Sequence, residues 1–125
     1  MFALRPRASG DLAGLRGEVD RGLRTRRFLG YRESSQWARA AQPIVDELRL
    51  AVERAPSRDL VVLLERAVGH VVKVIGRADD SNGTIGDLGR ELLDLHAQVC
   101  DAERRRSGQA RRLDGALQLP RPGLL

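Results

Sequence analysis

Apolar residues recur every three or four positions over most of the chain, which is the spacing of one face of an amphipathic helix. The pattern is most regular after Thr84, which is expected to cap a helix that packs along a neighbouring helix. Another strong stretch follows Ser57 or Asp59, either of which can cap a helix that reaches about Arg77. Because apolar residues cover most of its circumference, this helix is expected to be the most enclosed. The seam of the last helix is Ile85, Leu88, Leu92, Leu95 and Val99.

Two further helices are predicted before these, and each contains residues that disfavour a helix. Asp11 is expected to cap the first, in which three glycines interrupt an apolar stripe. The second is expected to begin at Ser34 or Ser35 and to end near Arg54, with a kink or a break at residues 40–42 because Pro43 removes a backbone hydrogen bond. The stripe of the first helix is Leu12, Leu15, Val19 and Leu23. The stripe of the second is Trp37, Ala41, Ile44, Leu48 and Ala51, widened by Val45 and Val52.

These elements predict an all-α fold, either an antiparallel helical bundle or a short helical-repeat-like array of three to four main helices. The connection at residues 55–57 is short enough to make its two flanking helices antiparallel. Serine, glycine and proline interrupt the pattern near both ends of the chain. We therefore expect a flexible segment at residues 1–10, a single helical domain over 11–106, and a flexible basic tail over 107–125.

The formal net charge of +5 is distributed unevenly. Residues 1–32 hold eight arginines against three acids, and residues 104–125 hold six arginines against one acid. The middle of the chain, residues 33–103, holds eight bases against thirteen acids. The basic character therefore belongs to the two ends, and the helical middle is acidic.

Features of secreted and membrane proteins are lacking in the sequence. No run of 18 apolar residues occurs, and the first ten residues lack the apolar stretch of a secretory signal. The single cysteine, Cys100, cannot form an internal disulfide, which suits a reducing compartment. We therefore expect a cytoplasmic protein with no membrane partner.

Several short motifs between residues 25 and 102 carry a family resemblance. They are Arg-Arg-Phe-Leu-Gly-Tyr-Arg at 26–32, Trp-Ala at 37–38, Leu-Glu-Arg-Ala at 64–67, Asp-Asp-Ser-Asn-Gly at 79–83 with Gly-Asp at 86–87, and Leu-His at 95–96 with Cys100. This stretch resembles the helical region that follows the zinc finger in bacterial, actinobacterial-type SWIM zinc finger proteins. The resemblance implies an all-helical accessory region that serves in interactions. The finger itself needs three cysteines and a histidine, and this chain has one cysteine, so the finger is absent here. No zinc or nucleic-acid role is therefore carried over from the family.

The turn at residues 78–85 has a pattern similar to that of a calcium loop. When Gly83 is aligned with the glycine at the sharp turn of such a loop, Asp80 and Asn82 fall at ligand positions. Ala78 and Gly89 then occupy two positions that need strong oxygen donors. The sequence therefore favours a tight turn, in which Asp and Asn side chains bond their own backbone, over a metal site.

A zinc site is a second metal hypothesis. His96 and Cys100 lie four residues apart on one face of the last predicted helix, and His70 lies in the middle of the third. The three could meet across a helix pair and bind zinc with one open position. Packed histidines and a cysteine that acts as a small hydrophobe are the favoured alternative. We therefore expect no metal and no cofactor.

Arginine clusters near both ends of the chain suggest contact with phosphates. Only Phe28 and Tyr31 lie nearby to stack on bases, so a solvated flank is the simpler interpretation. The candidate nucleic-acid contacts are Arg24, Arg26, Arg27, Arg104, Arg105 and Arg106.

Known catalytic motifs are also lacking in the sequence. It has no Gly-rich phosphate loop, no His-Glu-x-x-His and no Gly-x-Ser-x-Gly elbow. We therefore expect no enzymatic activity, but a helical interaction or accessory module whose partner is another protein or a second copy of the chain. This expectation rests on apolar surface of the third and fourth predicted helices that short helices do not fully cover. The alternative is a basic nucleic-acid-associated protein that uses its arginine-rich ends.

Overall fold

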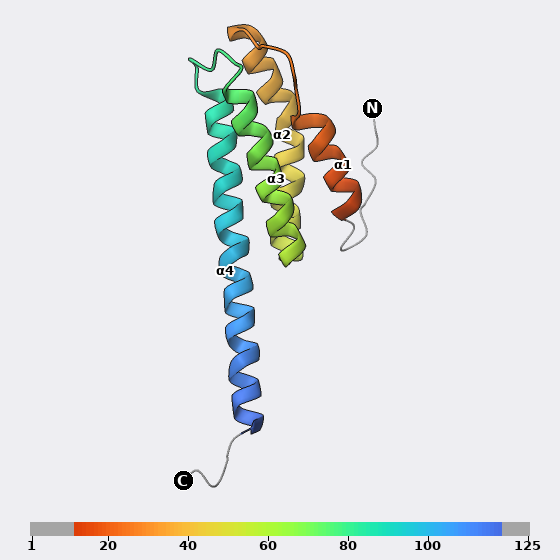
Figure 1. The fold of residues 1–125 in the computed structure, drawn as a ribbon, viewed down its shortest axis with the longest axis vertical. Helices are drawn as coiled ribbons and strands as arrows, with labels where there is room; N and C mark the ends of the chain where they lie inside the picture. The colour runs from red at the N-terminus through yellow and green to blue at the C-terminus, as the bar shows by residue number, and fades with distance from the viewer. Residues whose placement is uncertain (1–11, 119–125) are drawn as a thin grey trace.

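Four helices pack side by side in the computed structural model, which describes residues 12–118 and the side chains as far as Gly108. They are α1 (Leu12–Leu23), α2 (Tyr31–Arg54), α3 (Arg58–Ile75) and α4 (Thr84–Gln118). Consecutive helices run in opposite directions, and α1 packs against α2 and α3 (Figure 1). The predicted all-α bundle is therefore confirmed. The expected segment at residues 1–10 lies outside the described residues.

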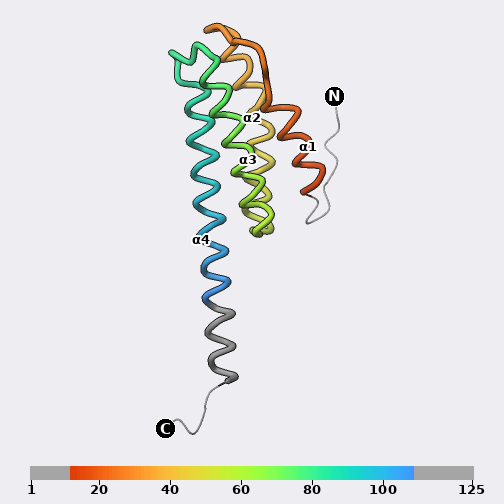
Figure 2. The backbone as a smooth tube through the Cα atoms, viewed as in Figure 1, coloured from red at the N-terminus to blue at the C-terminus, as the bar shows by residue number. Residues whose placement is uncertain are grey.

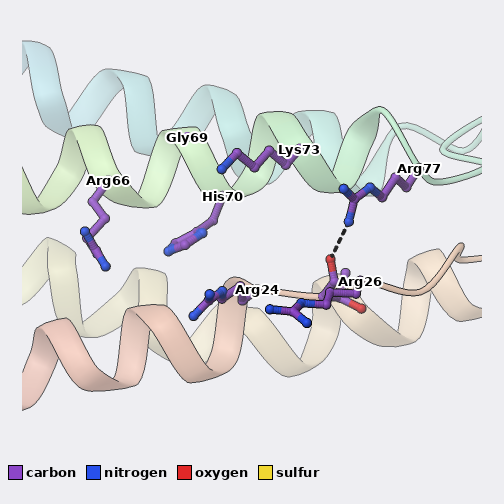
Figure 3. Close-up of a pocket in the computed structure, with 8 residues that line it drawn as sticks. Arg24, Arg26, Arg66, Gly69, His70, Lys73 and Arg77 are labelled. Atoms are coloured by element: carbon purple, nitrogen blue, oxygen red, sulfur yellow. Dashed lines mark hydrogen bonds between the residues drawn. The ribbon is translucent and has the colours of Figure 1, made fainter.

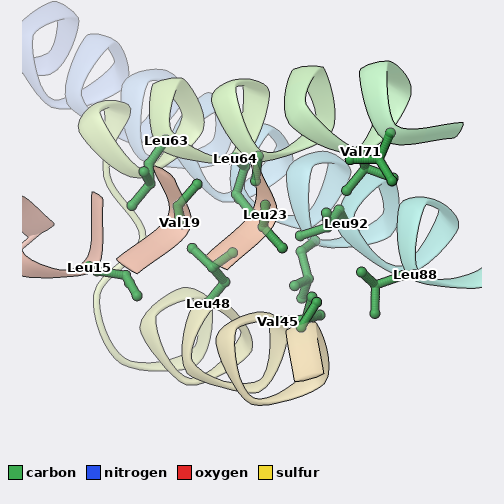
Figure 4. Packing of buried hydrophobic residues seen from close by; sticks show 14 of the residues in the cluster. Leu15, Val19, Leu23, Val45, Leu48, Leu63, Leu64, Val71, Leu88 and Leu92 are labelled. Atoms are coloured by element: carbon green, nitrogen blue, oxygen red, sulfur yellow. The ribbon is translucent and has the colours of Figure 1, made fainter. Parts of the chain in front are cut away.

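The apolar seams of the helices meet in one core. Every predicted seam residue of α4 is buried, and α3 contacts all three other helices. Figure 4 shows Val19 and Leu23 of α1 packed beside Leu63 and Leu64 of α3. Each fully buried leucine or valine of this core contributes roughly 1.5–3 kcal/mol through removal of apolar surface from water. The hydrophobic effect therefore explains why the predicted spacing becomes a bundle.

The start of α2 differs from the prediction. The helix begins at Tyr31, and Gly30 stands at the cap position without a side-chain hydrogen bond. Ser34 lies inside the helix, fully buried, and its hydroxyl is 3.5 Å from the carbonyl oxygen of Leu29. The predicted start at Ser34 or Ser35 is therefore wrong, because the serine bonds back to the preceding segment and does not cap the helix.

Pro43 does not break α2, which continues from Tyr31 to Arg54. Pro43 and Arg39 are both exposed, so the carbonyl group that loses its helical partner faces water and can be hydrated. The predicted break at residues 40–42 is therefore wrong, whereas the alternative of a kink there stays a prediction. The buried face is also turned slightly from the predicted stripe, because Trp37, Ile44 and Ala51 are only partly buried. The buried residues of α2 are Ser34, Ala38, Ala41, Val45, Leu48 and Val52.

The caps of α3 and α4 are made by different kinds of residue. Ser57 caps α3 as predicted, and its hydroxyl oxygen accepts a hydrogen bond from the amide of Leu60 at 3.1 Å. Thr84 is instead the first residue of α4. The Asp80 carboxylate, four residues earlier, accepts hydrogen bonds from the amides of Ile85 at 2.8 Å and Gly86 at 2.9 Å. Asp80 therefore satisfies two of the free N–H groups at the start of α4.

The segment between α1 and α2 is joined to the turn between α3 and α4. The amide of Leu29 donates to the carbonyl of Arg77 at 3.0 Å, and the amide of Asp79 donates to the carbonyl of Leu29 at 2.8 Å. These bonds make an isolated parallel bridge between Leu29 and Ala78. Leu29 is 3% exposed. The bridge therefore holds the arginine-bearing residues 24–28 at the end of the bundle where α3 stops.

The last helix is longer than the sequence predicted. The guanidinium group of Arg106 reaches the carbonyl oxygen of Pro56, in the connection between α2 and α3, at 3.3 Å. From there α4 continues to Gln118 (Figure 1). The coloured part of the tube in Figure 2 already extends beyond the ends of α2 and α3. Residues 107–118, which were expected to belong to a flexible tail, are therefore helical, and residues 119–125 lie outside the described part of the chain.

Candidate anion-binding groove

A groove of about 620 Å³ lies between α3 and the segment that follows α1. Figure 3 shows cationic side chains entering it from both sides. A second hollow of about 390 Å³ adjoins it and shares Arg24, Thr25 and Arg26. The larger groove is lined by Arg24, Thr25, Arg26, Arg66, Gly69, His70, Lys73 and Arg77.

One wall of the groove is a single flank of α3 and its C-terminal end. Arg66, Lys73 and Arg77 are spaced by seven and four residues, and this spacing puts them on one side of the helical path. At a rise of 1.5 Å per residue, Arg66 and Lys73 are about 10 Å apart along α3, and Arg77 follows two residues after the last residue of the helix. Gly69 lies within the row, and a Cβ atom added there would meet nothing within 4 Å. The wall is therefore an open strip with cations along its length.

The other wall is short and well anchored. Arg24 and Arg26 lie between two buried leucines, Leu23 at 0% and Leu29 at 3% exposure. The guanidinium group of Arg77 also donates to the backbone carbonyl of Thr25 at 3.4 Å (Figure 3). Burial and hydrogen bonding therefore hold this wall against α3.

Asp20 neutralises one end of the groove. Its carboxylate accepts two hydrogen bonds from Arg66, at 2.6 Å and 2.9 Å, and lies 2.8 Å from Nε2 of His70. The bonds from Arg66 and His70 hold the pKa of the Asp20 carboxyl well below its usual range. The carboxylate raises the pKa of the Arg66 guanidinium in turn. Arg66 is therefore matched by an acid in the folded chain.

The remaining cations of the groove are not paired with an acidic side chain among the described residues. Within the described residues, no ion pair joins Arg24, Arg26, Lys73 or Arg77 to an acidic side chain. All four side chains belong to exposed residues. Like charges gathered along one depression make a positive potential that attracts anions. The groove is therefore suited to an anionic ligand.

The sequence analysis identified only part of this site. Arg24 and Arg26 line the groove as nucleic-acid candidates, whereas Arg27 is exposed beside it. Arg66, Lys73 and Arg77 were missed as candidates, although their common flank on α3 is a signal that the sequence contains. The other predicted cluster, Arg104, Arg105 and Arg106, lies at the opposite end of the bundle, where Arg106 contacts the α2–α3 connection.

The arginines of that second cluster are partly engaged with acids of α4. Arg104 lies 3.0 Å from the Asp101 carboxylate, and Arg106 pairs with Glu103. Arg105 is exposed. The two predicted arginine clusters therefore do not form a common surface within the bundle.

The predicted zinc candidates face different neighbours. His70 bonds to Asp20 on α1, whereas Nε2 of His96 lies 3.0 Å from the Glu65 carboxylate on α3. The sulfur of Cys100 lies 3.8 Å from the ring nitrogens of His96. No group of three or more His, Cys, Asp or Glu side chains in the described residues is placed to hold a metal ion. The structure therefore does not bring the three candidates together.

The calcium-loop candidates take part in the structure of the turn. Both carboxylate oxygens of Asp80 accept hydrogen bonds from the start of α4. The side-chain oxygen of Asn82 accepts from the amide of Thr84 at 3.2 Å and from its hydroxyl at 3.0 Å. Gly83 has a φ of +77°, which favours glycine. These contacts agree with the tight-turn interpretation.

The chain finds no match among protein-family models, curated proteins or solved structures. The fold and the groove thus define the protein only as a four-helix bundle with a basic groove at one end, and the resemblance to SWIM zinc finger proteins stays a prediction. Within residues 12–118, no helix has both the length and the apolar character needed to cross a membrane.

Proposed function

We propose that this protein is a non-catalytic interaction module that binds an anionic partner in the basic groove. The observation that supports the proposal is the meeting of Arg24, Arg26, Lys73 and Arg77 around one depression of about 620 Å³, without a paired acid among the described residues. Long cationic side chains with free donors hold anionic groups by charge and hydrogen bonding. The proposed role is therefore recognition.

The proposal combines the two hypotheses from the sequence. It keeps an interaction module, and it places the interaction in the basic groove beside α3 and not on the apolar surface of the third and fourth helices. It also keeps Arg24 and Arg26 as anion contacts. It does not need Arg104, Arg105 and Arg106, which lie at the other end.

A fluorescence anisotropy titration with a labelled heparin oligosaccharide tests the proposal, because heparin is a polyanion without bases. We expect binding whose affinity falls steeply as salt is raised. The double variant Arg26→Glu with Lys73→Glu should lose most of this affinity. The double variant Arg58→Glu with Arg105→Glu makes the same change in net charge outside the groove and is the matched control. An equal loss in both variants would contradict the proposal.

Self-association stays a second proposal for the same module. Four large apolar side chains of α3 and α4 remain exposed although the seams themselves are buried. Size-exclusion chromatography with light scattering tests whether a second copy covers them. If the protein is a monomer and still binds heparin, the result would favour anion binding in the groove over self-association. The exposed residues are Val62, Val72, Ile75 and Leu93.

A further inference from the structure

Two exposed aromatic side chains lie close together in the sequence, one on the segment before α2 and one at the first residue of α2. Phe28 is 70% exposed and Tyr31 is 57% exposed. Trp37, the third aromatic residue of the described chain, is partly buried, so the buried core contains no aromatic side chain among the described residues. Aromatic residues make up only 3% of the sequence, and two of the three in the described chain are exposed within a few residues of Arg24 and Arg26. The two rings are therefore candidates for ligand contact.

The backbone joins the residues that carry these rings to one end of the groove, although neither residue lines the groove itself. Leu29 lies between them in sequence, is buried, and is bonded through its amide to the carbonyl of Arg77. Arg77 lines the groove near Arg26, as Figure 3 shows. Phe28 and Tyr31 therefore lie on either side, in the sequence, of the residue that is bonded to Arg77.

The shape of the groove favours a chain of anionic groups over a single anion. Four cations that have no ion pair to an acid among the described residues border the groove, Arg24 and Arg26 on one wall and Lys73 and Arg77 on the other. One phosphate or carboxylate can contact only some of them. A ligand with several anionic groups along its length can contact cations on both walls.

We infer that the partner is a single-stranded nucleic acid, whose phosphates follow the groove and whose bases stack on Phe28 and Tyr31. This inference rests on the proposed function and names the class of the anionic partner. Unpaired bases present flat faces to aromatic rings, whereas the bases of a duplex are stacked on one another. A positively charged track beside stacking rings is the combination by which proteins bind single strands without reading their sequence.

An acidic peptide is the competing partner for the same cations. Its carboxylates can satisfy Arg24, Arg26 and Lys73, but acidic side chains offer no flat apolar surface to Phe28 and Tyr31. The rings therefore distinguish the two partners, since their removal should weaken the binding of a single strand and should not weaken the binding of an acidic peptide.

Anisotropy titrations of the full chain at low salt test the inference with four probes. These are a labelled oligothymidylate, a duplex of the same length, a polyglutamate peptide and the heparin oligosaccharide. We expect the single strand to bind at least tenfold more tightly than the duplex. The double variant Phe28→Leu with Tyr31→Leu removes both rings and keeps apolar side chains at exposed positions. It should weaken single-strand binding about tenfold or more, while heparin binding stays unchanged.

The control variant is Leu93→Ala, which shortens an exposed apolar side chain on α4 away from the groove. It should leave all four affinities unchanged. Equal affinity for single strand and duplex, or no effect of ring removal, would overturn the inference while heparin binding still supports the proposed function. Tighter binding of polyglutamate than of the single strand would also overturn it, in favour of a protein partner. Failure to bind any of the probes would overturn the proposed function as well.

Discussion

The carboxylate of Asp20 on α1 accepts two hydrogen bonds from the guanidinium group of Arg66 on α3, at 2.6 Å from Nε and 2.9 Å from a terminal nitrogen. Such a two-point contact fixes the relative position of both side chains. Asp20 also lies 2.8 Å from Nε2 of His70, one helical turn further along α3. A short helix with interior glycines is thereby tied to α3, which contacts all three other helices.

We expect this contact to make stability depend on pH in the acid range. The pKa of Asp20 is lowered in the folded chain from its ordinary value of 3.8, first by the hydrogen bond from Arg66 and then by that from His70. Its contribution to the free energy of unfolding is therefore complete above about pH 4 and is lost as the pH falls further. Urea denaturation should show Asp20→Asn less stable by about 1 kcal/mol near neutral pH. The difference from the wild type should shrink towards pH 2–3, and a constant difference would contradict the assignment.

The same substitution should strengthen anion binding. Asp20→Asn removes the negative charge at one end of the groove and leaves the positive charge of Arg66 unmatched. We expect heparin affinity at low salt to rise several-fold, with a steeper dependence on salt. Asp94→Asn, which removes an exposed acid from α4, is the matched control for net charge. A similar gain in both variants would show that net charge, and not the groove, controls binding.

Asp80 should contribute more to the stability of the fold than any other side chain of the turn between α3 and α4. Asp80→Ala removes the acceptor for the amides of Ile85 and Gly86 at the start of α4. We expect the free energy of unfolding to fall by about 1–2 kcal/mol, as when a helix cap is lost. Asp94→Ala, in the middle of the same helix, should change it by less than about 0.5 kcal/mol. Chemical denaturation of both variants measures the difference.

Gly69 offers a substitution that should stabilise the protein. It lies in the interior of α3, and an added Cβ would meet nothing within 4 Å. Gly69→Ala should therefore raise the free energy of unfolding by about 0.5–1 kcal/mol, because alanine loses less backbone freedom in a helix. Thermal unfolding followed by circular dichroism measures this change. A lower melting temperature would mean that the flank of α3 is less open than described.

The same substitution at Gly83 should destabilise the protein. Its φ is +77°, a conformation that residues with a Cβ rarely adopt, although the space around it is open. Gly83→Ala should lower the free energy of unfolding by about 1 kcal/mol. The same thermal experiment compares it with Gly69→Ala, and two changes of equal sign would contradict the assignment of backbone strain to Gly83 alone.

The apolar seams of the helices followed from the sequence because burial decides which positions of a helix are apolar. The seam from Ile85 to Val99 is visible as a spacing of three and four residues, and all its members are buried. The start of α2 could not be predicted in the same way. Serine is a common capping residue, so the sequence suggested Ser34 as the cap of α2. Its contact with the carbonyl oxygen of Leu29, five residues earlier, depends on the folded structure and cannot be read from the sequence.

The groove was harder to predict because its two walls are distant in sequence. Arg24 and Arg26 are separated from Lys73 by a complete helix, and only the packing of α1 on α3 brings them together. Charge counts along the chain placed the basic character at the ends, and this division hid the basic flank of the otherwise acidic middle. The common flank of Arg66 and Lys73 on the predicted third helix is a signal of this wall that the sequence does contain.

The bridge between Leu29 and Ala78 also affects how quickly and how tightly a partner could bind. A segment with several arginines would normally sample many conformations, and a ligand that selects one of them loses affinity through the entropy of ordering. Here Leu23 and Leu29 are both buried, so the five residues between them are restrained before any encounter. Their conformational freedom is already reduced when the bundle folds, and association should consequently approach the rate set by electrostatic steering.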